Sequence, residues 1–179
     1  MPFDDYVWSA GLVTDLVNTS PQVWHGAEHL PDVGTLRTFL DEHGLVARAV
    51  EPSDLPPVQA LRERLRPLIE ESDPARRVAA ASALTGAVGG LTLADGWAAT
   101  VPDDASPAEV LGVVAGVGIL AVHLHLGVDR FRPCSSDTCS GVFIDTSRPG
   151  RRRYCMPGHC GNRANVAAHR ARRRAAGRT

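Results

Sequence analysis

The four cysteines of this chain lie near its C-terminal end, and their spacing constrains the fold more than any other feature. Four residues separate Cys134 from Cys139, four separate Cys155 from Cys160, and 15 residues lie between the two pairs. Two short loops that each supply two thiolates can surround a tetrahedral zinc ion while ordering little chain. The spacing therefore predicts one structural Zn²⁺ site made of these four cysteines.

Two disulfides are the main alternative to zinc. Disulfides persist in oxidising compartments, and the first ten residues show no apolar run followed by a cleavage site. A redox motif typically has two residues between its cysteines, not four. We therefore favour the metal and expect a cytoplasmic protein. His159 and His169 are further candidate ligands, but four thiolates already complete the zinc shell and leave no position for a catalytic water.

Charge is divided unevenly along the chain. Residues 1–147 contain all 20 acidic residues and nine arginines, whereas residues 148–179 contain ten arginines and no acidic residue. A basic surface attracts polyanions such as nucleic acid, although a solvated tail is the simpler alternative. We expect phosphate contacts from the basic residues of this end, with duplex DNA as the partner: Arg151, Arg152, Arg153, Arg163, Arg170, Arg173 and Arg174.

The last 40 or so residues of the chain are expected to form a zinc-ribbon-like finger followed by a basic helix. Residues 141–145 and 151–155 are predicted to be two strands of a β-hairpin that holds the cysteine pairs apart. Residues 162–174 place alanines along one helical face and arginines opposite. Asn162 is most simply a helix cap, while Arg163 either reads a base or bonds within the finger.

The part before the finger, residues 1–132, is predicted to be a helical domain with a small β-hairpin. The expected fold class is therefore mainly α. Residues 133–179 are predicted to form the second domain. Helix starts are indicated by N-cap residues at Asp32 and Asp73 and by the capping-box pair Ser106 and Glu109. Two further helices are expected. One covers residues 8–19, and the other begins near Asp54 and is kinked or shortened by Pro67. A hairpin is expected over residues 91–101.

The stretch 110–126 approaches the hydropathy of a membrane span. It is 17 residues long and contains His123 and His125. A buried helix at the centre of the core is the favoured interpretation, with no membrane partner. The same helix could contribute an interface to a homodimer, since proteins that bind duplex DNA often dimerise.

Asp15 and Asn18 fall one helical turn apart and could face a pocket together. Such a pair is able to bind a small polar effector, although capping or bonding to a neighbouring loop is the more common role for these residue types.

The residues around the fourth cysteine resemble a known family. The sequence Cys160-Gly161-Asn162-Arg163, with Phe143, Asp145, Ser147 and the arginines before Cys155, is similar to the CGNR zinc finger, apart from Tyr154 where that family commonly has Trp. Upstream, residues 15–19 and the later Gly44-Leu45 resemble the ABATE domain. The resemblance implies a metal-binding, stress-response transcription regulator in which the finger binds DNA and the helical domain senses an effector.

An enzyme is not expected, because the chain has no phosphate-binding glycine loop, nucleophile elbow or metalloprotease helix. Two other classes stay open beside a DNA-binding regulator: an RNA-binding zinc protein and a zinc-stapled protein-interaction module.

Overall fold

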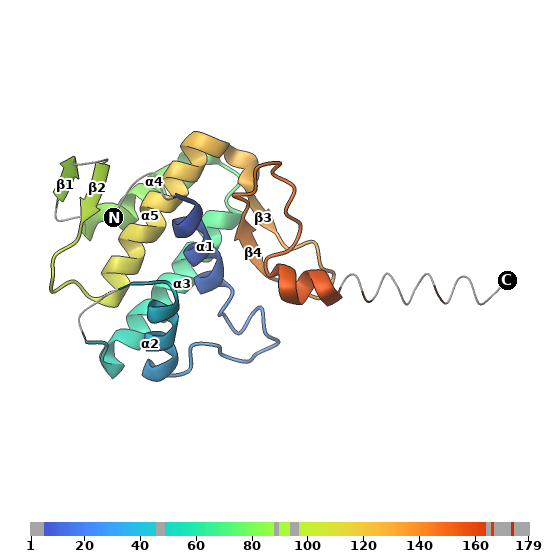
Figure 1. The fold of residues 1–179 in the computed structure, drawn as a ribbon, viewed down its shortest axis with the longest axis horizontal. Helices are drawn as coiled ribbons and strands as arrows, with labels where there is room; N and C mark the ends of the chain where they lie inside the picture. Colours follow the sequence, from blue (N-terminus) through green and yellow to red (C-terminus); the bar gives the residue numbers. More distant parts are fainter. Residues whose placement is uncertain are drawn as a thin grey trace.

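The computed structural model describes residues 6–45, 49–87, 90–93, 97–163, 166 and 173, with no side-chain detail for residues 87–100. Within these residues, helices form a central body and two small antiparallel sheets lie on opposite sides of it (Figure 1). The helices are α1 (Tyr6–Val17), α2 (Val33–Glu42), α3 (Leu55–Glu70), α4 (Pro74–Leu84) and α5 (Pro107–Leu126). The strands are β1 (Gly90–Leu93), β2 (Trp97–Thr100), β3 (Phe131–Pro133) and β4 (Val142–Ile144). The predicted mainly α fold with a small hairpin is confirmed.

The helix starts follow the capping residues of the sequence. Asp32 accepts a hydrogen bond from the backbone N–H of Thr35 at 2.8 Å, and Asp73 caps α4 in the same manner. Ser106 and Glu109 form the predicted capping box of α5. Each of these side chains satisfies backbone N–H groups that a helix leaves free at its first turn.

α3 continues past Pro67 to Glu70. Of the two effects predicted for Pro67, a kink or a shortening, the shortening does not occur. Ile69, beyond the proline, is buried in the core, and Arg77 donates hydrogen bonds to the carbonyls of Leu68 and Glu71 at the helix end. Burial and capping of the last turn offset the hydrogen bond that Pro67 cannot make.

α5 is the central helix of the core and packs against α1, α3 and α4. By length and composition it could cross a membrane, but 56% of its most apolar window is buried inside the fold. A Cβ at Gly118 would lie 2.5 Å from Cβ of Ser9, so this glycine allows α1 to approach α5 closely. The predicted core helix is confirmed, and Leu124, at 76% exposure, is its one large apolar side chain turned to solvent among the described residues.

β4 takes part in two cores at once. Val142 and Ile144 pack into the main core with the helices, whereas Phe143 packs with Cys155 and Cys160. This division follows from the alternation of side chains along a strand. The strand therefore joins the finger to the helical body, and the boundary predicted between residues 132 and 133 falls inside β3.

β4 pairs with β3, not with residues 151–155 as predicted. Phe131 lies opposite Ile144, and Pro133 lies opposite Val142. Residues 151–155 form no strand because their backbone bonds elsewhere: the N–H of Arg152 donates to the carboxylate of Asp145, and the carbonyl of Arg153 accepts from Ser135. The finger still contains a β-hairpin and two cysteine loops. The strand that pairs with β4 is β3, which precedes it in the chain.

Candidate metal centre

The four cysteine sulfurs converge on one point. All four Sγ atoms lie within 4.8 Å of one another, with 3.6 Å between Cys139 and Cys155 and 3.7 Å between Cys155 and Cys160. Thiolates about 2.3 Å from a tetrahedral zinc ion are about 3.8 Å apart, whereas disulfide sulfurs are about 2.0 Å apart. The cysteines are unpaired. Cys134, Cys139, Cys155 and Cys160 therefore form a zinc-binding site, as the spacing predicted.

Two tight loops present the ligands. Cys134 directly follows β3 and donates its N–H to the carbonyl of Gly141 at 2.8 Å, which closes the first loop. Cys160 lies in a π-helical turn, Pro157–Gly161, and its N–H donates to the carbonyl of Met156 at 2.8 Å. Backbone hydrogen bonds thus help to position one cysteine of each pair.

The thiols need a cation to ionise together. Burial, and then the charge of Cys134, raises the pKa of Cys155, while burial raises the pKa of Cys160 to about 11. Burial also acts on Cys134, but backbone hydrogen bonds of Cys155 and Ser136 outweigh it and lower the pKa of Cys134. A thiolate-binding divalent ion such as Zn²⁺ supplies the positive charge that this cluster requires.

Gly141 lies against the sulfurs where no side chain fits. Its N–H donates to Sγ of Cys139 at 3.3 Å. A Cβ at this position would lie 2.5 Å from Sγ of Cys155 and 2.8 Å from Oδ1 of Asn18. N–H···S bonds of this kind orient a metal-bound thiolate. The glycine thus brings the zinc site and the helical body into contact.

The carboxylate of Asp145 organises the loop that follows β4. It is fully buried and accepts hydrogen bonds from the N–H and hydroxyl of Ser147, from the N–H of Arg152 at 3.0 Å and from the guanidinium of Arg132 at 3.4 Å. Burial alone raises its pKa, but the bonds from Ser147 and Arg152 outweigh burial and lower it. Asp145 is therefore an ionised anchor inside the finger.

Comparison with known families agrees with this arrangement. Residues 130–173 match the CGNR zinc finger, and residues 10–124 match ABATE, described as "Putative stress-induced transcription regulator". The chain belongs to the ABATE family. No curated protein matches the chain. This ABATE protein thus joins a helical ABATE domain to a metal-binding CGNR finger, in the order that its sequence indicated.

The arginines predicted to contact phosphate divide into two groups in this ABATE protein. Arg152 turns inward: its Nε donates to the carbonyl of Tyr154 at 2.9 Å, its Nη2 donates to the carbonyl of Cys155, and its guanidinium lies over the ring of Phe143. Arg152 thus bonds within the finger, and its predicted phosphate contact stays a prediction. The predicted arginines that are exposed are Arg151, Arg153, Arg163 and Arg173, while Arg170 and Arg174 lie outside the described residues.

Asp15 and Asn18 do not face a common pocket. Asn18 is 3% exposed, and its Nδ2 donates to the carbonyls of Thr14 and Val142, while its Oδ1 accepts from the N–H of Val142. Asp15 is exposed and pairs with Nε2 of His43 at 3.2 Å. The structure does not bring the two predicted effector residues together, because Asn18 joins α1 of the ABATE domain to β4 of the finger.

Two arginines that the sequence did not single out also support the finger. Arg66 of α3 donates to the carbonyl of Ser140 and pairs with Glu70 at 3.0 Å. Arg130 donates to the carbonyls of Asp145 and Ser147. Their positions carry no distinguishing pattern, whereas Asp145 two residues before Ser147 is typical of a side-chain-bonded turn and was a detectable signal.

Proposed function

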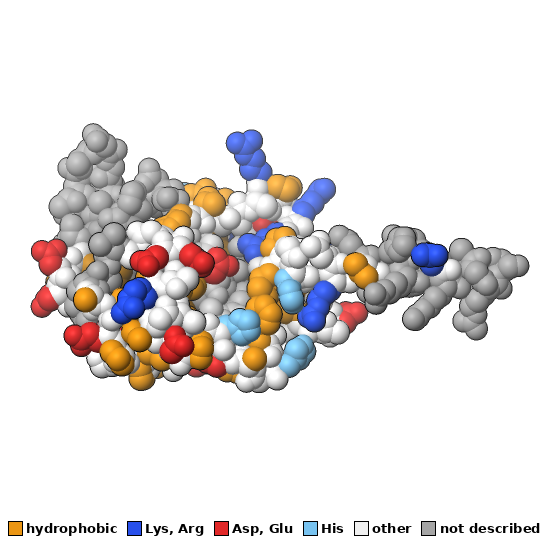
Figure 2. Space-filling model, turned by 60° about the horizontal axis from the view of Figure 1, so that its bottom comes forward, with side chains coloured by type: hydrophobic (Ala, Val, Ile, Leu, Met, Phe, Trp, Pro, Cys, Tyr) orange, Lys and Arg blue, Asp and Glu red, His pale blue; other side chains and the backbone are white. Residues whose placement is uncertain are grey.

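We propose that this protein is a DNA-binding transcription regulator whose finger contacts DNA phosphates and whose helical domain senses a small effector. The placement of charge supports the proposal. In Figure 2 most of the acidic side chains in view lie over the helical body, and most of the cations in view lie toward the finger end. From Thr146 to Arg163 the chain has no acidic residue. A polyanion is attracted to such an end and repelled by the other.

The observation that carries the proposal is the alternation of three consecutive arginines. Arg152 is anchored inward by its bonds to Tyr154 and Cys155, and Arg151 and Arg153 on either side are exposed. Arg153 also lies over the ring of Tyr154, with 5.6 Å between its guanidinium carbon and the ring centre. Two exposed guanidinium groups therefore flank an anchored one on the finger.

The segment that presents them is rigid before it meets a partner. Asp145 binds the N–H of Arg152, and the carbonyl of Arg153 accepts from Ser135 beside the zinc loop. Phosphate binding to a pre-ordered segment loses less conformational entropy than binding to a free tail. This favours a binding surface over a merely solvated basic end.

Arg163 supports duplex DNA as the partner. It is exposed at the start of the helical residues that follow the second cysteine loop. A helix held at its start by a metal site can enter a major groove or lie along phosphates. We propose binding rather than catalysis as the activity, since four thiolates complete the zinc shell, and a cytoplasmic location where DNA is accessible.

The test is a titration of the zinc-loaded protein with random duplex DNA and structured RNA at several salt concentrations. Replacing Arg151 and Arg153 together with Gln should weaken DNA binding and reduce the salt slope by about two, one for each lost phosphate contact. The matched control replaces Arg64 and Arg76, both exposed on the helical body, with Gln and should change neither.

Each other outcome identifies a different class of protein. An unchanged salt slope in the Arg151/Arg153 variant would refute the phosphate assignment. Tighter binding to RNA than to DNA would favour an RNA-binding zinc protein. If the protein binds neither nucleic acid at low salt, a protein-interaction module is favoured. A chain truncated after Arg132 is an unsuitable control, because it loses β4 and exposes the core that Val142 and Ile144 cover.

A further inference from the structure

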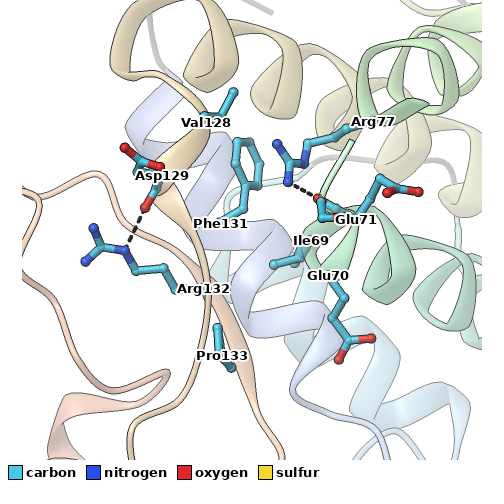
Figure 3. A pocket seen from close by; sticks show the side chains of 10 residues that line it. Ile69, Glu70, Glu71, Arg77, Val128, Asp129, Phe131, Arg132 and Pro133 are labelled. Carbon is cyan, nitrogen blue, oxygen red and sulfur yellow. Dashed lines mark hydrogen bonds between the residues drawn. The ribbon is translucent and has the colours of Figure 1, made fainter. Parts of the chain in front are cut away.

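A groove separates the end of α3 and the start of α4 from β3 (Figure 3). Its volume is about 680 Å³, within the range of about 300–1,000 Å³ that small-molecule sites occupy. The apolar part of its lining comes from both halves of the protein: Ile69 from α3, and Val128, Phe131 and Pro133 from the segment that leads into the finger. The groove is thus shared by the helical body and the finger.

A buried guanidinium forms part of the wall. Arg77 is only 4% exposed, and its Nε and Nη2 donate to the backbone carbonyls of Leu68 and Glu71. The third nitrogen, Nη1, is buried and has no hydrogen-bond partner among the residues that the structure describes. In Figure 3 the guanidinium projects from α4 toward Phe131, and it lies 4.1 Å from the centre of that ring.

An unpartnered N–H on a buried cation is costly, and native structures rarely leave one without a partner. The partner must be an acceptor, because a guanidinium only donates. An anionic oxygen gives the strongest bond of this kind. The other two nitrogens are already held by the backbone at the end of α3, so Nη1 is the one left for a ligand. Because Nη1 is covered in this structure, a ligand oxygen reaches it only when a neighbouring side chain of the groove shifts.

The rim of the groove restricts the charge of the ligand. Glu70, Glu71 and Asp129 line it together with one further cation, Arg132, whose charge is paired with the buried Asp145 at 3.4 Å. Glu70 is paired with Arg66 at 3.0 Å, and Glu71 accepts a hydrogen bond from the N–H of Asp73 at 2.9 Å, but both remain carboxylates at the edge of the site. Repulsion from these groups disfavours phosphates and other multiply charged anions, and it tolerates a single negative charge placed against Arg77.

We propose that this groove binds a small monocarboxylate, with its carboxylate on Nη1 of Arg77 and its apolar body on Val128 and Phe131. The groove would then be the effector site, and its ligand a monocarboxylate. The regulatory role of this site rests on the proposed function. The binding itself does not depend on DNA.

The groove is connected to the zinc site by two routes. β3 forms one wall and passes directly from Pro133 to the ligand Cys134. On the other wall, Glu70 pairs with Arg66, which donates to the carbonyl of Ser140, the residue after Cys139. A ligand that changes the distance between these walls also shifts β3 or Arg66, which contact the loop that holds Cys134 and Cys139. Ligand binding in the groove can thereby change the conformation of the finger.

The first experiment measures binding of benzoate to the zinc-loaded full chain by ¹H–¹⁵N correlation spectra and thermal shift, without DNA. Benzamide, phenyl phosphate and benzylamine serve as matched probes that change only the charged group. Benzoate should bind saturably, with shifts centred on Arg77 and residues 128–133, and at least about tenfold more tightly than benzamide, because charge-assisted hydrogen bonds are the stronger ones. Stronger binding of phenyl phosphate or benzylamine, or absence of benzoate binding, overturns the proposal.

Variants place the ligand in the groove. Val128, at 42% exposure, is replaced with Asp, which puts a like charge beside the carboxylate without opening the core. Val7→Asp is the control, since Val7 is 53% exposed on α1 and does not line the groove. Benzoate binding should fall at least about tenfold in Val128→Asp and persist in Val7→Asp. Equal binding in both variants overturns the assignment.

Arg77→Gln tests the guanidinium itself, with circular dichroism to confirm that α3 and α4 remain folded. Loss of the preference for benzoate over benzamide is expected, and a retained preference contradicts the role of Arg77. DNA titration with and without benzoate is performed separately. A protein that binds benzoate but no DNA would retain this inference while the proposed function fails.

Discussion

At the scale of single residues, buried polar groups hold the finger together alongside its zinc ligands. Asp145 accepts four hydrogen bonds, and Arg152 donates to two carbonyls beside Cys155. The cysteine positions were predictable because zinc geometry limits ligand spacing. Which of three adjacent arginines turns inward was not predictable, because this depends on Asp145 and Phe143, whose positions are set by the fold.

Replacing Gly141 with Ala should disrupt the zinc site. The new Cβ would meet Sγ of Cys155 at 2.5 Å and Oδ1 of Asn18 at 2.8 Å, and overpacking of a rigid site costs about 1–3 kcal/mol. Zinc content per chain and the midpoint of thermal unfolding should both fall. Gly158→Ala is the control, since a Cβ there meets nothing within 4 Å. Equal zinc content in the two variants would contradict the predicted clash.

The pair formed by His43 and Asp15 predicts a pH dependence of stability. The hydrogen bond that the protonated ring of His43 donates to the carboxylate of Asp15 raises the pKa of His43 above its usual 6.5, despite burial. Because the folded pKa is raised, this stabilisation is complete below pH 6.5 and is lost as the pH rises through the folded value. Asp15 is 55% exposed, so the contribution is roughly 0.2–1 kcal/mol.

Urea unfolding at pH 6.0 and pH 8.5 measures this contribution. Asp15→Asn should reduce the fall in unfolding free energy between the two pH values, whereas Asp41→Asn, an exposed acid of α2, should leave it unchanged. The same fall in all three proteins would show that the pair does not control it.

At the scale of elements, caps and apolar stripes were sufficient to predict the helices, while strand pairing was not. α2, α4 and α5 begin at the residues whose side chains cap them, a local relation that the sequence displays. β3 is only three residues long and its partner is reached after an eight-residue loop. A strand so short has no visible alternation, so the sequence indicates only a domain boundary at these residues and not a strand.

The contact between α1 and β4 should depend on Asn18. Replacing it with Ala leaves the buried N–H and carbonyl of Val142 without their side-chain partner, at a cost of about 1–3 kcal/mol for each unsatisfied group. The free energy of unfolding should fall accordingly, with zinc still bound in the absence of denaturant. Gln22→Ala, at an exposed position, is the control. A loss no larger than in the control would refute a joining role for Asn18.

At the scale of the whole molecule, the finger and the helical body should unfold together. Val142 and Ile144 belong to the main core, while Phe143 of the same strand packs on two zinc ligands. Loss of the metal therefore removes support from the helices as well as from the finger. The sequence predicted both parts, but not this dependence, since it arises from contacts between residues far apart in the chain.

Removing zinc with a chelator should lower the midpoint of thermal unfolding of the helices by about 10 °C or more, because a structural zinc site contributes several kcal/mol to folding. Circular dichroism at 222 nm follows the helices, and thiol titration confirms that all four cysteines have become reactive. Restoring zinc should restore the midpoint. Helices that melt at the same temperature with and without zinc would show two independent domains.

The bond between Asn18 and Val142 spans 124 residues of chain, which gives the order of synthesis a consequence for folding. α1 leaves the ribosome first, and at about 5–20 residues per second its partner strand follows roughly 6–25 s later. During that interval the side of α1 that β4 will cover has no partner. The nascent chain therefore carries an open surface on α1 that is closed only when β4 of the finger has been made.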